Sequence, residues 1–133
     1  MNASATATAP ASPYERIGAE PTVRRIVARF YEIMDSDPAV APLRALHAGD
    51  LTPMREKLGD FLVGWLGGPP VYFQRQDARC MGEAHSGFAI DGAIRDQWMS
   101  CMNRALDENQ VEPELRALIS AALARMTGGM VNR

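Results

Sequence analysis

The stretch Met81-Gly-Glu-Ala-His-Ser-Gly-Phe-Ala-Ile90 places His85, one of only two histidines in the chain, among small and apolar residues. The stretch Arg95-Asp-Gln-Trp98 follows, so a tryptophan on the apolar face of an expected helix comes 13 residues after the histidine. In an arbitrary helical protein, a single histidine is more often a surface or hydrogen-bonded residue than a ligand. The rest of the chain has to decide between these two interpretations.

Apolar residues recur every three or four positions along most of the chain, which is typical of helices with one buried face. Proline near helix starts and glycine just past helix ends support the same assignment. The pattern predicts an all-α domain with four main helices, a short segment near 40–46 and a short helix ending near His85. The main helices are expected over residues 21–35, 51–65, 92–105 and 113–127.

The length of 133 residues predicts one domain over residues 13–133, preceded by a tail over residues 1–12 whose small, polar composition is typical of disorder. A net charge of −2 without any basic run argues against a nucleic-acid partner. No run of 18 apolar residues occurs, which argues against a membrane span. The N-terminus lacks the basic and apolar regions of a secretory signal, so we expect a cytoplasmic protein.

The two cysteines, Cys80 and Cys101, do not form a C-x-x-C pair. This spacing excludes a zinc ribbon, a thioredoxin-like motif and the C-x-x-C-H signature of covalent haem attachment. We expect two free thiols in a reducing compartment.

A haem pocket in a helical domain needs a neutral imidazole on one side of the iron, an apolar slot for the porphyrin and polar groups on the other side. His85 can supply the imidazole, and Tyr31 and Trp98 carry O–H and N–H donors that need partners when buried. Taken one by one, these residues fit an ordinary helical core equally well. Candidates for the slot are Phe30, Leu58, Phe61, Phe88, Ile90 and Met102.

Together these residues resemble the truncated haemoglobins, specifically their second group, over residues 14–126. Each matching piece is weak alone, but their joint order and spacing make the resemblance specific. The pieces are Val27-Ala-Arg-Phe-Tyr31, Lys57-Leu-x-x-Phe-Leu62, Trp65-Leu-Gly-Gly-Pro-Pro70 with Tyr72, His85-x-x-Phe-x-Ile90 and Arg95-Asp-x-Trp98-x-x-Cys-Met102.

The resemblance implies a two-over-two helical sandwich around non-covalent haem b. His85 would be the proximal iron ligand, and Tyr31 and the Trp98 indole would form distal hydrogen bonds to the iron-bound ligand. His47 would either join them on the distal side or be a solvent-exposed loop histidine. Further residues expected at the haem are Met54, Lys57, Leu58, Tyr72 and Met81.

One departure concerns the haem propionates. Relatives commonly carry arginines just before the proximal histidine, and this chain has Gly82 and Ala84 there. Lys57 matches a basic position on the distal helix and is a candidate for one propionate. Candidates for the other are Arg75, Arg79 and Tyr72.

The function expected from the resemblance is reversible binding of dioxygen, and of carbon monoxide and nitric oxide, for redox chemistry or sensing rather than bulk transport. Nitric oxide dioxygenation or peroxidase activity would use the same pocket, but the chain has no flavin or nicotinamide domain, so a separate reductase would be required. The alternative is a cofactor-free interaction or sensory module. Either a monomer or a homodimer fits the resemblance.

Overall fold

A computed structural model describes residues 11–133, and every regular element in that part of the chain is helical, as expected. The four long helices are α2 (Ala19–Ser36), α4 (Thr52–Trp65), α6 (Gly92–Glu108) and α7 (Pro113–Gly128). The shorter elements are α1 (Pro13–Ile17), α3 (Ala41–Arg44), α5 (Met81–His85) and the 3-10 turns η1 (Pro38–Val40) and η2 (Tyr72–Gln74). None of the helices in residues 11–133 combines the length and apolar character that crossing a bilayer requires.

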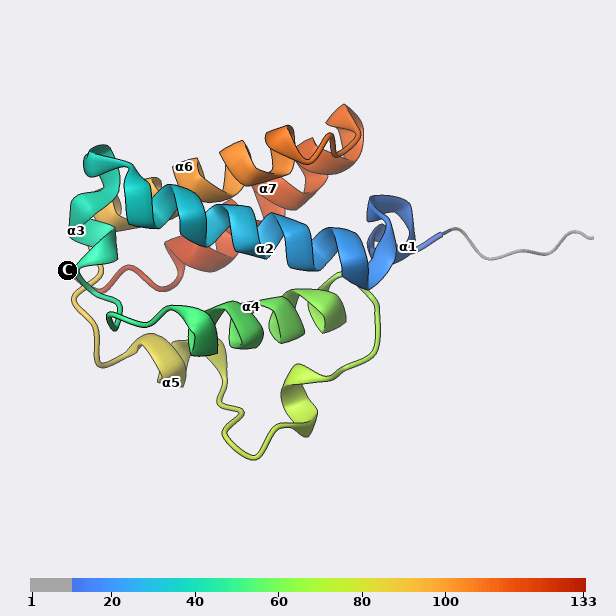
Figure 1. Cartoon of the computed structure of the whole chain (residues 1–133). Coiled ribbons are helices and arrows are strands. Elements are labelled where there is room, and N and C mark those ends of the chain that lie inside the picture. Colours follow the sequence, from blue (N-terminus) through green and yellow to red (C-terminus); the bar gives the residue numbers. More distant parts are fainter. Residues whose placement is uncertain (1–10) are drawn as a thin grey trace, which may run out of the picture.

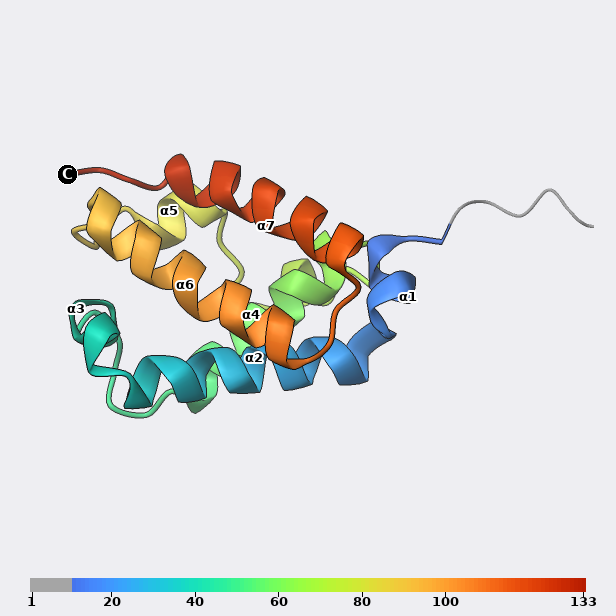
Figure 2. The same cartoon turned by 90° about the horizontal axis from the view of Figure 1, so that it is seen from above.

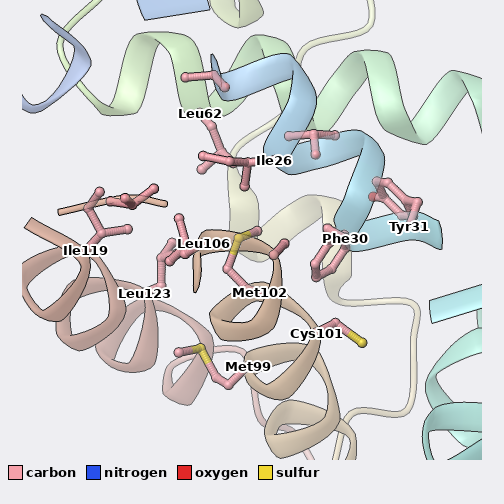
Figure 3. Close-up of a cluster of buried hydrophobic side chains, with 14 of the residues drawn as sticks. Ile26, Phe30, Tyr31, Leu62, Met99, Cys101, Met102, Leu106, Ile119 and Leu123 are labelled. Atoms are coloured by element: carbon pink, nitrogen blue, oxygen red, sulfur yellow. The ribbon is translucent and has the colours of Figure 1, made fainter. Parts of the chain in front are cut away.

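The four long helices form two antiparallel pairs (Figures 1 and 2). Helix α2 packs against α4, α6 packs against α7, and α2 also contacts α6 across the middle of the molecule. The side chains between the pairs form the core, which includes Phe30, Met102 and Leu106 (Figure 3). The four main helices and the short helix ending at His85 are therefore confirmed.

Helix α1 was not expected, because the first helix was predicted to begin near Pro21. Ser12 forms a capping box with Glu15: its Oγ accepts from the Glu15 N–H at 3.1 Å, and its own N–H donates to Glu15 Oε1 at 3.0 Å. The Tyr14 N–H then donates to the Leu66 carbonyl at 2.8 Å, which attaches α1 to the end of α4. Residues 1–10 lie outside the described residues, so the proposed division into tail and domain stays a prediction.

The glycine pair after α4 is required by this packing. A Cβ atom on Gly68 would lie 2.7 Å from the Tyr14 ring and 2.8 Å from the Val63 carbonyl oxygen, and Gly67 has a φ of +107°. Only glycine adopts such a φ without strain. The Gly-Gly-Pro element therefore ends α4 and leaves room for α1.

Candidate functional site

Three aromatic residues predicted for the site lie together between α2 and α6. The ring centroid of Phe30 is 4.8 Å from that of Tyr31 and 5.1 Å from that of Trp98, both in edge-on geometry. Phe30 is fully buried, and Tyr31 is 4% exposed. The structure thus brings Phe30 of α2 and Trp98 of α6, 68 positions apart in the chain, into contact.

The polar atoms of two of these aromatics are unused. The hydrogen bonds among residues 11–133 include none from the Tyr31 hydroxyl or the Trp98 indole N–H. In this part of the chain the one fully buried side-chain polar atom without a partner is Asn103 Oδ1, so the two donor atoms remain accessible. Burial raises the pKa of Tyr31 well above its usual value, so the hydroxyl keeps its proton. The site therefore holds two hydrogen-bond donors with no acceptor in the described chain.

His85 is the last residue of α5 and is half-buried. Its Nδ1 lies 2.7 Å from the Met81 carbonyl oxygen. Because a carbonyl only accepts, Nδ1 carries the proton and Nε2 has its lone pair free. This second-sphere hydrogen bond is the arrangement that fixes the orientation of metal-ligating histidines.

His47 lies beside the aromatic cluster. Its ring centroid is 6.1 Å from that of Tyr31, and its Nδ1 lies 2.9 Å from the Leu43 carbonyl oxygen. Burial lowers the pKa of His47, and the positive charge of Arg44 lowers it further, against the hydrogen bond to Leu43. His47 is half-buried rather than exposed, so its geometry matches the first of the two alternatives, while its role stays a prediction.

The predicted slot residues divide by burial. Phe30, Phe61, Tyr72, Ile90 and Met102 are buried, and Met54, Leu58, Met81 and Trp98 are partly buried against the core. Phe88 is different, because 45% of its surface is exposed and it is not part of the core. Ile94, one helical turn before Trp98 on α6, is also partly buried there. Its spacing of four residues from Trp98 is the signal that identifies it as a further slot candidate.

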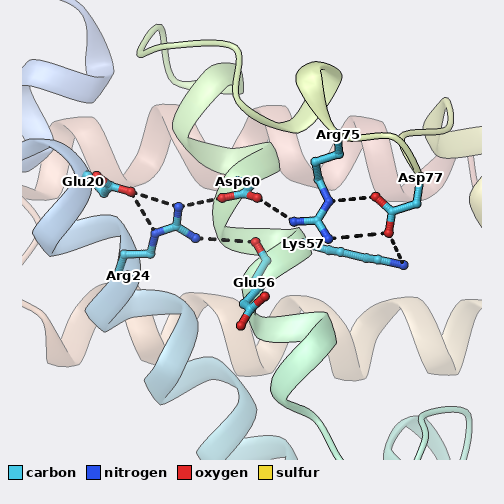
Figure 4. Close-up of polar contacts among 7 residues, drawn as sticks. All are labelled: Glu20, Arg24, Glu56, Lys57, Asp60, Arg75 and Asp77. Atoms are coloured by element: carbon cyan, nitrogen blue, oxygen red, sulfur yellow. Dashed lines mark hydrogen bonds and ion pairs between the residues drawn. The ribbon is translucent and has the colours of Figure 1, made fainter.

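Charged residues between α2, α4 and the loop after α4 form a continuous network (Figure 4). Asp60 lies at its centre, 2.6 Å from Arg24 and 2.7 Å from Arg75. Asp77 accepts from Arg75 at 2.9 Å and pairs with Lys57 at 3.2 Å. Hydrogen bonds from Arg75 and Lys57 lower the pKa of Asp77 to about 2.

The structure shows the hydrogen-bond partners of three candidates for binding the propionates: Lys57, Arg75 and Tyr72. Lys57 and Arg75 both face a carboxylate, Asp77, which sequence reasoning did not single out. The Tyr72 hydroxyl donates to the Arg79 carbonyl at 2.8 Å and accepts from the Arg79 N–H at 3.2 Å, so it is turned toward the backbone. The two cations therefore suit an anionic ligand better than Tyr72 does.

The model of the family described as bacterial-like globin matches residues 12–132. The chain belongs to this family. The all-helical structure of residues 11–133 agrees with that assignment.

The individual relatives of this globin are group II truncated haemoglobins. The chain is 34% identical over 122 residues to the group 2 truncated hemoglobin of Bacillus subtilis, covering 92% of this chain and 89% of that protein. The group II 2-on-2 hemoglobin of Agrobacterium tumefaciens is 38% identical with a TM-score of 0.89, covering 96% and 98% of the two chains. A truncated oxygen-avid haemoglobin from Bacillus subtilis has a TM-score of 0.82 at 34% identity, covering 92% and 100%.

These relatives confirm the group II assignment and the two-over-two helical sandwich, and they imply a haem-binding globin.

Proposed function

We propose that this globin holds haem b non-covalently through His85 and reversibly binds dioxygen on the opposite, distal side. The haem iron would supply the site at which a diatomic ligand binds. The chain fits this group because His85 presents a free Nε2 while its Nδ1 is held by the Met81 carbonyl at 2.7 Å. With neither cysteine in a C-x-x-C-H motif, no covalent attachment is expected.

The residues proposed to line the porphyrin also fit. Apolar side chains that are only partly buried come from three elements: Met54 and Leu58 from α4, Met81 from α5, and Ile94 and Trp98 from α6. A flat apolar ligand between these helices would cover surface that the protein alone leaves partly exposed, and burial of apolar surface is favourable. Phe88 is omitted from this proposal because it is largely exposed.

The observation that carries the proposed function is the pair of unused donors, Tyr31 and Trp98. Both donor atoms are accessible and make no hydrogen bond within residues 11–133, so they are free to donate to a ligand placed between α2 and α6. Dioxygen held at the distal side becomes polarised and accepts strongly, whereas carbon monoxide accepts weakly. The two donors therefore favour slow release of dioxygen, a property in line with the oxygen-avid neighbour from Bacillus subtilis.

We further propose that Lys57 and Arg75 hold the propionates, with Asp77 as the carboxylate that competes for them. Both cations lie within 4 Å of Asp77, and Arg75 also pairs with Asp60. A propionate carries the same carboxylate group as aspartate, so it would take the same hydrogen bonds. This arrangement compensates for the absence of a basic side chain at Gly82 and Ala84.

Carbon monoxide and nitric oxide are expected to bind in the same pocket. Dioxygenation of nitric oxide or reduction of peroxide would consume electrons, and a separate reductase would have to deliver them. Sensing needs no such partner. Slow release of dioxygen suits either role better than bulk transport does.

The test is the visible absorption spectrum of the purified protein in three states: oxidised, reduced, and reduced with carbon monoxide. We expect a Soret band that shifts on reduction and again on addition of carbon monoxide. A protein that shows no Soret band even after addition of hemin would overturn the proposal. That result would favour a cofactor-free module that keeps the globin fold.

A further inference from the structure

The last residues of the chain return to the segment that follows His85. After α7, the chain runs toward the end of the molecule where α6 begins (Figure 2). There the Asn132 N–H donates to the Ile90 carbonyl at 2.8 Å, and Asn132 Oδ1 accepts from the Ile90 N–H at 2.9 Å. The Asn132 Nδ2 donates to the Phe88 carbonyl at 2.8 Å. One residue thus binds three backbone groups of the segment 88–90.

These contacts matter because they are the long-range hydrogen bonds of a segment whose apolar packing comes from Met81 and Ile90. Helix α5 has five residues and none of them is buried. The hydrogen bonds within 83–88, such as Phe88 N–H to the His85 carbonyl at 3.1 Å, are local. Among residues 11–133, every hydrogen bond that joins the segment 86–90 to a distant part of the chain comes from Asn132 or Arg133.

Asn132 is itself held by a fixed part of the fold. The Arg95 side chain, in the first turn of α6, donates to the Ala124 carbonyl at 2.7 Å and to Thr127 Oγ1 at 3.2 Å. Thr127 is buried and its hydroxyl donates to the Leu123 carbonyl at 2.8 Å. The end of α7 is therefore joined to α6 only a few residues before Asn132, so the position of Asn132 follows from the packing of the two long helices.

We propose that Asn132 is a positioning residue for His85, an inference that rests on the proposed function above. By fixing the backbone at Phe88 and Ile90, it sets where α5 ends and so the position and tilt of the His85 imidazole. A primary amide is suited to this task because it offers a donor and an acceptor at once, one for each backbone group. Aspartate would keep the acceptor for the Ile90 N–H and lose the donor to the Phe88 carbonyl.

The experiment compares the parent protein with Asn132→Ala, Asn132→Asp and the control Arg133→Ala. The Arg133 variant keeps the backbone hydrogen bond to Ile90, and no described contact involves the Arg133 side chain. Two readouts are taken: the iron–histidine stretching frequency of the reduced protein by resonance Raman spectroscopy, and the rate of hemin transfer to haem-free myoglobin. Circular dichroism checks that each variant is folded.

We expect Asn132→Ala to shift or broaden the iron–histidine band and to speed hemin transfer by about 5- to 30-fold, as the loss of two side-chain hydrogen bonds predicts. Asn132→Asp should have a smaller effect, and Arg133→Ala none. If Asn132→Ala fails to fold, the same comparison rests on Asn132→Asp. A folded Asn132 variant with the parent's band and transfer rate would overturn the inference.

A second pair of variants separates positioning from general stabilisation. In His85→Gly supplied with free imidazole, the ligand is no longer joined to the segment that Asn132 holds. Adding Asn132→Ala to that variant should leave the iron–imidazole frequency unchanged, because the path from Asn132 to the ligand has been cut. A shift of equal size with free imidazole would show a merely structural role and overturn the inference.

The two proposals fail in different ways. A parent protein that never binds hemin would overturn both. A parent protein that binds hemin normally, with Asn132 variants identical to it, would overturn only the positioning role.

Discussion

The proposed distal and proximal sides of the haem pocket are held in place by different interactions. On the distal side, α2 buries eight residues, among them Phe30 and Tyr31. On the proximal side, α5 buries none, and the long-range hydrogen bonds to the segment that follows it come from Asn132 and Arg133 within residues 11–133. Apolar burial is non-directional, whereas a hydrogen bond depends on one geometry. The distal aromatics should therefore tolerate changes elsewhere that displace the proximal helix.

Replacing His85 with alanine is expected to have the largest effect on the proximal side. The variant loses the only imidazole on α5, so normal haem ligation should be abolished while the helical fold remains, since no residue of α5 is buried. Absorption spectra of the reduced protein measure haem ligation, and circular dichroism measures the helical fold. A five-coordinate haem bound stoichiometrically to the variant without added imidazole would contradict the assignment.

Replacing Phe30 with alanine tests the opposite property of the distal side. The side chain is fully buried at the crossing of α2 and α6, so its truncation should lower the free energy of unfolding by about 3–5 kcal/mol. The matched control is Phe73→Ala, because Phe73 is 66% exposed and should change stability by about 0.5 kcal/mol or less. Urea unfolding of both variants provides the comparison. Equal effects would mean that burial does not hold the distal side.

Replacing Tyr31 with phenylalanine removes a distal donor and leaves the core packed. A hydrogen bond to a polarised acceptor contributes about 1.5–3 kcal/mol, so dioxygen should dissociate roughly 10- to 100-fold faster. Tyr72→Phe is the control, because that hydroxyl already binds the backbone of Arg79. Stopped-flow measurement of dioxygen dissociation distinguishes the two variants. An unchanged rate in the Tyr31 variant would remove Tyr31 from the mechanism.

If Lys57 holds a propionate and Asp77 competes for it, substitutions at these two residues should change the rate of hemin loss in opposite directions, and by smaller factors. Lys57→Met should speed hemin loss roughly two- to five-fold, and Asp77→Asn should slow it by a similar factor, because exposed ion pairs are weak. Both effects should diminish at high salt. Asp107→Asn, which removes the partner of Arg116 at a distance from the pocket, is the control. Faster hemin loss in the Asp77 variant would show that Asp77 supports the loop rather than competing with the ligand.

The smallest expected effect is the pH dependence due to His47. Burial holds its pKa below the ordinary value of 6.5, so the unfolded chain takes up a proton before the folded protein does. The stability contributed by neutral His47 is complete above pH 6.5 and is lost as the pH falls through the lowered pKa. In His47→Gln, this part of the stability change between neutral and mildly acid pH should be absent. An unchanged pH profile of urea unfolding would contradict a buried, neutral His47.

Sequence reasoning was most successful where one helix face carries the information. Val23 and Phe30 lie two helical turns apart on α2, and Trp65 ends a similar apolar series on α4. The four long helices follow from such periodicity. The same reasoning included Phe88 in the slot because its spacing from His85 matched the family. The Phe88 side chain is 45% exposed in the structure, and its place in the slot stays a prediction.

Local pattern was sufficient to predict an all-α domain and its main helices and to suggest His85, Tyr31 and Trp98 as candidates, and the resemblance to the truncated haemoglobins added the group II family. These features depend on residues close together in the chain or on their order along it. Only the tertiary structure showed that Asp77 faces Lys57 and Arg75, that Tyr31 and Trp98 have unused donors, and that Asn132 binds the segment after His85. The hydrogen bonds of Asn132, for example, reach a residue 44 positions away, and a contact between single atoms so far apart in the chain leaves no periodic pattern in the sequence.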